Sequence, residues 1–424
     1  MTSHRRILMI VFIMLIGLGV MCIGCGTNLP QTPVPSPTAV AIDGQQTMAV
    51  PAKTPVLNTP QTTPTGSTPP QPRDIITTPL LPQATSVATP ATVDMGEIIF
   101  LDGCKPIWRM DGANGQNREL LYEDDLCKYA PELSPDNQWM SYLAEGRGQD
   151  RPISLWVLDV EGKDAWQVSA EVPALHNGWL ATGKLLYTEY PSYVDDPNMD
   201  EPPDWGSDYR TFIYDPATRT RTEIPAIPFG KEYSMYEFSP TEEKLAVVKE
   251  ETNELVVMNL DGSETVPLVK DYEPNYFVWS PDGRYLAYGS EEERDSVLRS
   301  PEELYVLDVT SGQIRRITHK DDRISVDVRS WSPDGKWIAF DKALQLCVIH
   351  VEDGEEKCFD ARAPGVLGFP VPWSPDSSMV AVSERIPSQG PSARWDIYSI
   401  RVADGKMTRL TQDSSSANYL LWRP

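Results

Sequence analysis

Histidine and cationic side chains are scarce in this sequence. The 424 residues include four histidines, and His4 lies in an N-terminal targeting segment, so little imidazole is left for a histidine-rich metal centre. The 37 Lys and Arg residues face 61 Asp and Glu residues, which gives a net charge of -24. Such a surface repels phosphate backbones and anionic lipid headgroups. We therefore expect no nucleic-acid partner, no catalytic metal and no cofactor.

Sequence signatures of common catalytic sites are also missing. The sequence contains no Gly-x-Ser-x-Gly elbow, no His-Glu-x-x-His motif and no phosphate-binding glycine loop. An enzyme is therefore not the expected function. A hydrolase or lyase site at the centre of the fold is the alternative from that class.

The N-terminus has the pattern of an export signal. Arg5 and Arg6 precede an apolar run at residues 7–23, which ends in small residues and cysteine. The ending "CIGC" resembles the bacterial lipobox, and this implies cleavage after Gly24 and lipidation of Cys25, with Cys22 where that pattern usually has leucine. An uncleaved anchor is the alternative, because the run is long enough to span a bilayer. Either way, residues 1–25 would tether the chain outside the cytoplasm.

Residues 26–93 are dominated by proline and threonine, as in "TPQTTPTGSTPPQPR". Too little apolar surface is available there to offset the entropy cost of ordering, and proline favours extended polyproline II. We expect a disordered tether between the anchor and the rest of the chain.

A short pattern recurs along the remainder of the chain. "WSPDGRYLAY" begins at Trp279, "WSPDGKWIAF" at Trp331 and "WSPDSSMVAV" at Trp373, and related forms begin at Leu133 and Phe238. In Ser-Pro-Asp-Gly, proline fixes φ, aspartate accepts backbone hydrogen bonds and glycine allows positive φ. The aspartates of these turns are therefore predicted to be structural: Asp136, Asp282, Asp334 and Asp376.

Each recurrence is followed by short runs rich in Val, Ile, Leu, Tyr and Trp, separated by turn residues, which predicts about four strands per unit. With hairpins such as "LYVLDVTSGQIRRIT", these units resemble the TolB-type β-propeller repeat. The resemblance covers about residues 96–424 and implies the fold but not a biological role. Seven anchor positions indicate seven blades: Leu133, Trp179, Phe238, Trp279, Trp331, Trp373 and Trp422.

The two ends of this region fit a closed ring. "EIIFLDG", "PIWRMDG" and "RELLYED" supply three strands of a first blade, and the terminal "NYLLWRP" supplies its inner strand. Closure removes exposed strand edges. The predicted fold class is all-β, a seven-bladed propeller of four-stranded antiparallel blades over residues 94–424.

Four cysteines lie beyond the signal and allow three connectivities. Cys347 and Cys358 occupy facing positions in the third and fourth strands of the sixth blade. Cys104 and Cys127 fall on one rim beside the first blade. We expect two disulfides, Cys104 with Cys127 and Cys347 with Cys358, as in an oxidising compartment, with buried free thiols as the alternative.

Insertions fall between the second and third strands of several blades, so one face of the ring is elaborated. The longest, residues 190–209, combines aromatic and acidic side chains, which suits a protein or glycan contact. Two alternatives are a loop folded onto its own blade and a calcium site, although no Asp-x-Asp-x-Asp-Gly spacing occurs. The candidate binding residues are Tyr190, Tyr193, Trp205, Tyr209, Asp204 and Asp208.

Histidines offer little support for chemistry at the ring centre. His176 and His319 are expected in connections between blades, and His350 at the end of a strand. The sequence therefore favours a monomeric, membrane-anchored, extracytoplasmic binding or scaffolding propeller of the bacterial cell envelope. Its partner would be an envelope protein or a cell-wall glycan.

Overall fold

The computed structural model describes residues 95–145, 153–169, 172–191, 208–225, 227, 233–263, 266–269, 274–291, 302–318, 326–342, 345–362, 371–386, 394–412 and 417–424. The predicted anchor, Cys25 and the linker at residues 26–93 lie outside these residues. No helix that is both long and apolar enough to cross a bilayer occurs in the described part of the chain.

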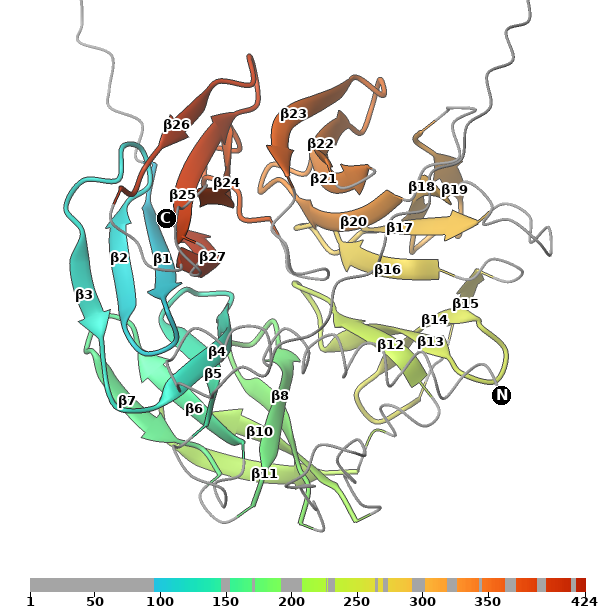
Figure 1. The fold of residues 1–424 in the computed structure, drawn as a ribbon. Coiled ribbons are helices and arrows are strands. Elements are labelled where there is room, and N and C mark those ends of the chain that lie inside the picture. The colour runs from blue at the N-terminus through green and yellow to red at the C-terminus, as the bar shows by residue number, and fades with distance from the viewer. Residues whose placement is uncertain are drawn as a thin grey trace, which may run out of the picture. The chain divides into compact units, whose positions relative to one another are not determined.

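The described residues form seven antiparallel sheets that follow one another around a ring (Figure 1). The first three blades are β27 (Ala417–Arg423), β1 (Glu97–Asp102), β2 (Ile107–Asp111) and β3 (Glu119–Tyr122); β4 (Cys127–Leu133), β5 (Trp139–Glu145), β6 (Ser154–Asp159) and β7 (Asp164–Gln167); and β8 (Ala174–Trp179), β9 (Leu185–Glu189), β10 (Arg210–Asp215) and β11 (Thr220–Ile224).

The next two blades are β12 (Tyr233–Phe238), β13 (Lys244–Lys249), β14 (Leu255–Asn259) and β15 (Val266–Val269); and β16 (Pro274–Trp279), β17 (Tyr285–Glu291), β18 (Glu302–Asp308) and β19 (Ile314–Arg316). Blade 6 is β20 (Val326–Trp331), β21 (Trp337–Lys342), β22 (Gln345–His350) and β23 (Glu356–Arg362), and blade 7 is β24 (Met379–Ile386), β25 (Arg394–Arg401) and β26 (Met407–Arg409). The predicted all-β, seven-bladed architecture is confirmed.

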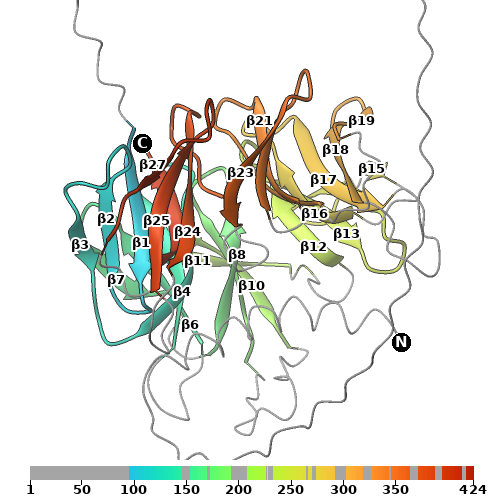
Figure 2. The same cartoon turned by 45° about the horizontal axis from the view of Figure 1, so that its top comes forward.

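The C-terminal strand closes the ring, as predicted. β27 pairs antiparallel with β1, with Glu97 opposite Arg423 and Ile98 opposite Trp422, and the two strands lie side by side in both views (Figures 1 and 2). The indole N–H of Trp422 also donates to the carbonyl oxygen of Met95 at 2.6 Å. The edge of β1 is thereby paired, and blade 1 has four strands.

Blade 7 is the least complete sheet among the described residues. Its inner segment is joined to β24 by a single bridge, between Trp373 and Val380. Pro372 has no N–H to donate, and its carbonyl oxygen instead accepts the N–H of Ala381 at 2.9 Å. The described part of this inner strand begins at Val371, because residues 363–370 lie outside the described residues.

Buried apolar clusters join every pair of neighbouring blades, including blade 7 with blade 1. Between blades 5 and 6, for example, Leu304, Trp331 and Phe340 pack together. The second strand of each blade is covered on both faces. In β21, for example, consecutive residues are buried instead of every second one. One apolar layer thus continues around the ring.

The anchor tryptophans bind neighbouring blades to one another. The indole N–H groups of Trp179, Trp279 and Trp331 donate to backbone carbonyl oxygens of the preceding blade at 3.2, 3.0 and 3.1 Å. In blade 4 the anchor is Phe238, which has no N–H and instead lies against the backbone of Gly178. The large ring fills the space between blades in each case.

The aspartates of the repeated turns have structural roles. Asp282 accepts the Ser280 hydroxyl at 2.5 Å and the Arg284 N–H at 3.1 Å, and Gly283 has a φ of +68°. The same contacts recur at Asp136, Asp334 and Asp376. These carboxylates are occupied in holding the turns.

Both predicted disulfides are present, Cys104 with Cys127 and Cys347 with Cys358. Cys127 is the first residue of β4, and Cys347 on β22 lies directly opposite Cys358 on β23. The sequence register of blade 6 was therefore correct.

Candidate functional site

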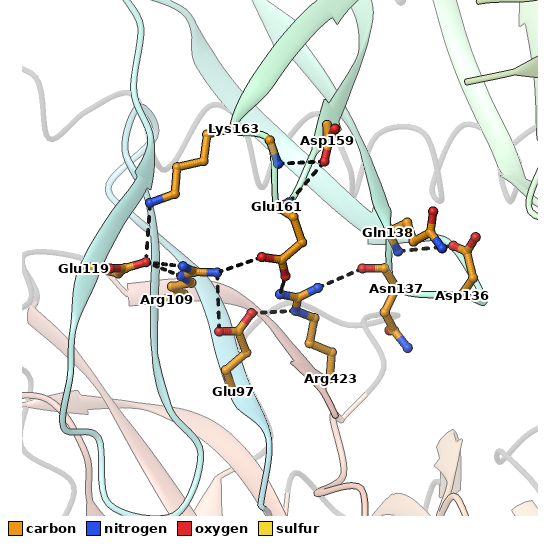
Figure 3. A network of polar contacts seen from close by, with 11 residues as sticks. Glu97, Arg109, Glu119, Asp136, Asn137, Gln138, Asp159, Glu161, Lys163 and Arg423 are labelled. Carbon is orange, nitrogen blue, oxygen red and sulfur yellow. Dashed lines mark hydrogen bonds and ion pairs between the residues drawn. The ribbon is translucent and has the colours of Figure 1, made fainter. Parts of the chain in front are cut away.

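A cavity of about 400 Å³ lies where the ring closes. Figure 3 shows its side chains. Arg423 pairs with Glu97 and with Glu161 of the neighbouring blade, and its guanidinium donates to the carbonyl oxygen of Asn137 at 2.9 Å. Arg109 pairs with Glu119, whose pKa it lowers. These charges neutralise one another. We therefore interpret the ion pairs around the cavity as contacts that hold β27 in place and not as a binding site for a charged ligand.

Carboxyl groups that pair with no Lys or Arg among the described residues lie on the inner strands in the region of blades 2 to 4. The strands β4, β8 and β12 lie nearest the centre of the ring (Figure 1). Each carries a β-bulge, a feature that redirects side chains out of the regular alternation. We call the polar residues gathered there the axial cluster: Glu132, His176, Asn177, Tyr236 and Glu237.

His176 is held by hydrogen bonding to blade 2. Its Nδ1 lies 3.1 Å from the Ser141 hydroxyl, which also accepts the indole N–H of Trp179 at 3.1 Å. Which of the two groups donates in the His176–Ser141 contact depends on the imidazole tautomer, because the Ser141 hydroxyl also lies 3.5 Å from the Glu132 carbonyl oxygen. Burial lowers the pKa of His176 to about 4, so the ring is neutral at pH 7. Its 3.9 Å approach to Glu132 is therefore not an ion pair.

The two carboxyl groups of the cluster titrate at unusually high pH. Burial raises the pKa of Glu132 to about 7. Burial, reinforced by the charge of Glu132, raises the pKa of Glu237 to about 8. The Glu132 side chain is 45% exposed and Glu237 is also exposed, so water reaches both carboxyls although three blades surround them. That water weakens each shift but keeps its direction.

A chain of polar contacts connects the axial cluster with the base of the 190–209 loop. Asn177 donates to the hydroxyl of Tyr236 at 3.3 Å and accepts the hydroxyl of Thr188 at 2.8 Å. Tyr190 lies two residues after Thr188. Burial raises the pKa of Tyr190, and electrostatic interactions with Tyr236 and Tyr209 raise it further. The axial cluster is therefore linked through Asn177 to Thr188 on β9, the strand that leads into the loop.

The base of this loop is rigidly built. The Glu189 side chain is 2% exposed and pairs with Arg221 and with Arg210, the latter at 3.1 Å. The Tyr190 and Tyr209 rings, which flank the loop, lie with centroids 6.4 Å apart. The predicted residues Tyr190, Tyr209 and Asp208 are thus placed at the base, with Asp208 exposed. Tyr193, Asp204 and Trp205 lie outside the described residues.

Other insertions connect the same pair of strands in their blades, as predicted. They join β5 to β6, β17 to β18 and β24 to β25. We call the side of the ring that carries these connections and the 190–209 loop the insertion face. The hairpins between third and fourth strands lie on the opposite side.

The predicted place of His176 was wrong, because it lies within β8 and not in a connection between blades. The anchor Trp179 marks where the inner strand of the third repeat ends, but no sequence signal marked where that strand begins. His350 does end β22, with Nδ1 2.8 Å from Asp353, and His319 lies outside the described residues. Glu132 and Glu237 were missed, although each directly precedes a blade anchor, Leu133 and Phe238.

Donor atoms suitable for a metal ion come together elsewhere. Within the described residues, one group of three possible ligands lies within 4.8 Å, and it consists of Cys347, Glu356 and Cys358. The axial cluster is not part of that group. Its groups can exchange protons near neutral pH or accept hydrogen bonds from a bound partner.

No protein-family model and no curated protein sequence matches this chain. Among solved structures, an oligogalacturonate lyase in complex with manganese is 18% identical, with a TM-score of 0.50, over 69% of this chain and 83% of that one. A prolyl endopeptidase is 15% identical, with a TM-score of 0.50, over 76% of this chain and 49% of that one. TolB from Acinetobacter baumannii is 13% identical, with a TM-score of 0.41, over 78% and 67%.

The chain has a β-propeller fold. At these identities the likenesses concern the fold alone. The expected propeller fold is confirmed by the seven sheets themselves.

Proposed function

We propose that this protein is a membrane-anchored, extracytoplasmic propeller that binds an envelope protein through its insertion face. The observation that carries the proposal is the fixed base of the 190–209 loop, which follows Thr188, a hydrogen-bond partner of the axial cluster. Buried Glu189 with its two arginines and the Tyr190 and Tyr209 rings fix that base. Binding loops on a rigid scaffold are a common solution for recognition.

The chemistry of the loop suits a protein partner. Tyr193, Trp205 and Tyr209 would supply aromatic contact area, and Asp204 and Asp208 would supply negative charge. With a net charge of -24, the chain would associate most readily with a partner that presents a basic surface. A cell-wall glycan is the other ligand that this combination of rings and acids would suit.

Two features support the proposed location. The disulfides Cys104–Cys127 and Cys347–Cys358 are typical of oxidising compartments. The lipobox-like segment ending at Cys25 would supply the membrane attachment, and the linker at residues 26–93 would hold the propeller away from the bilayer. A lipidated N-terminus should release a diacylglycerol-modified Cys25 peptide on proteolysis and mass spectrometry.

The test is co-purification of partners with the full-length protein from its own membrane, compared with a Trp205→Ala/Tyr209→Ala variant. We expect the double variant to lose the partner while it still unfolds in one cooperative thermal transition. Glu352→Ala is the matched control, because Glu352 is exposed on a hairpin of the opposite side. Retention of the partner by the double variant, or its loss in the control, would move the contact away from the insertion face.

A further inference from the structure

The disulfide of blade 6 lies beside the Glu356 carboxylate, although a disulfide needs no carboxylate to form or to hold two strands together. Cys347 on β22 and Cys358 on β23 face each other with Cα atoms 4.0 Å apart. Glu356 precedes Cys358 by two residues and so projects from the same face of β23. Sγ of Cys358 lies 3.5 Å from Oε1 of Glu356, and the donor atoms of all three residues lie within 4.8 Å.

The two sulfur atoms have unequal access to solvent. Cys347 is 0% exposed, in the apolar cluster with Phe340 and Ile349. Cys358 is exposed on β23, the outer strand of the blade. A thiolate from solvent can therefore approach Cys358, whereas Cys347 is shielded.

The other disulfide has no comparable neighbour. In the part of the chain that the structure describes, Cys104 and Cys127 belong to no group of three potential ligands. The protein therefore carries two disulfides of similar chemistry, only one of which stands next to a third ligand. That difference makes Cys104–Cys127 an internal control.

We infer that reduction of Cys347–Cys358 creates a Zn²⁺ site in which both thiolates and the Glu356 carboxylate are ligands. Two thiolates and one carboxylate form a donor set that Zn²⁺ accepts, with water as a fourth ligand. Zn–S bonds of about 2.3 Å place two sulfurs less than about 4 Å apart in a tetrahedral site. Facing positions on adjacent strands can supply that separation after the S–S bond breaks.

A dithiol supplies the two electrons. Its first thiolate attacks Sγ of Cys358, the S–S bond breaks, and Cys347 leaves as a thiolate that takes up a proton. The second thiolate of the reagent then attacks the reagent sulfur of the mixed disulfide, which releases Cys358 and closes the reagent into a cyclic disulfide. Binding of Zn²⁺ displaces one proton from each thiol into solvent.

Lys342 competes with the metal for the carboxylate. Its Nζ lies 2.7 Å from Oε1 of Glu356, and both side chains are largely buried at 15% and 16% exposure. A cation that binds Glu356 must repel or displace this ammonium group. Removing the Lys342 charge should therefore strengthen metal binding, an effect that no purely structural role of the pair would produce.

The experiment uses the full chain with Cys104→Ser/Cys127→Ser, so that the blade 6 pair supplies the disulfide tested. The protein is reduced with a dithiol, the reagent is removed without oxygen, and Co²⁺ is titrated as a spectroscopic probe before Zn²⁺ competition. We expect one Co²⁺ per chain with a thiolate charge-transfer band. Glu356→Gln should weaken binding by at least about tenfold and Lys342→Met should strengthen it.

Three results would overturn the inference. These are a folded protein whose Cys347–Cys358 bond resists the dithiol, a reduced protein without the Co²⁺ thiolate band, and a Glu356→Gln variant with unchanged Co²⁺ affinity. Near-ultraviolet circular dichroism of each reduced variant keeps the result interpretable. Cys347→Ser/Cys358→Ser with Cys104 and Cys127 intact should bind no Co²⁺ under the same treatment.

Discussion

Blades 3 and 6 place different pairs at the same two positions of the repeat. Asn177 and Arg329 each lie two residues before the anchor tryptophan, in the bulge of the inner strand. Asn177 accepts a hydrogen bond from Thr188, whereas Arg329 forms a buried ion pair with Asp341. Thr188 and Asp341 occupy equivalent positions, because each lies three residues after the residue that pairs with the anchor tryptophan of its blade.

The two sides of the inner wall consequently differ in charge. In blade 6 the Asp341 carboxylate is paired through Oδ2 with the Arg329 guanidinium, so this pair adds no net charge to the wall. In blades 2 to 4, no Lys or Arg pairs with Glu132 or Glu237 among the described residues. The repeat therefore provides one backbone, and the residues just before each anchor decide whether the inner wall of a blade carries an ion pair or carboxyl groups without a Lys or Arg partner among the described residues.

Opening the ring should affect both walls at once and give the largest effect. Deletion of residues 418–424 removes most of β27, the Trp422 contact and the Arg423 clamp. We expect loss of a single cooperative thermal transition, because β1 and blade 7 would both lose buried partners. Scanning calorimetry would measure this. An unchanged transition would refute closure by β27.

Breaking the Arg329–Asp341 ion pair in blade 6 should have the second-largest effect on stability. Arg329→Ala leaves Asp341 buried without a counter-ion and should cost about 3–5 kcal/mol of unfolding free energy in urea titrations. Asn177→Ala in blade 3 removes neutral hydrogen bonds and should cost only about 1 kcal/mol. Arg329→Leu/Asp341→Leu should recover most of the loss. Equal costs in the two blades would contradict the comparison.

The smallest effect concerns pH. Glu132 and Glu237 have folded-state pKa values raised from 4.5 to about 7 and about 8, so their stabilising effect is present at low pH and is lost as pH rises through these values. His176, lowered from 6.5 to about 4, acts in the opposite sense, with stability lost as pH falls from 6.5 towards 4. Above pH 6.5 the carboxyls act alone.

The effect of the two carboxyl groups on stability is therefore best measured between pH 6.5 and 8. Across this window the melting temperature of the wild-type protein should fall more than that of a Glu132→Gln/Glu237→Gln variant. Arg329→Leu/Asp341→Leu is the matched control, because it should leave the slope against pH as in the wild type. Parallel slopes for wild type and the Gln variant would show that neither carboxyl is perturbed.

Most of the fold could be predicted because its signals repeat. Each Ser-Pro-Asp turn marked the end of an inner strand, and the facing positions of Cys347 and Cys358 followed from the same register. The axial cluster could not be predicted in this way, because its members come from three blades and share no motif. His176 was misplaced because the anchor Trp179 marks the end of β8, and no sequence signal marks its start.

The measurement that tests the central claim most directly is site-specific photo-crosslinking of the full chain in its native membrane. A photoreactive residue would replace Tyr209 on the insertion face and, in a second protein, Glu352 on the opposite side. We expect position 209 to capture one protein partner and position 352 to capture none. Capture of that partner from position 352, with none from 209, would contradict the proposed binding face.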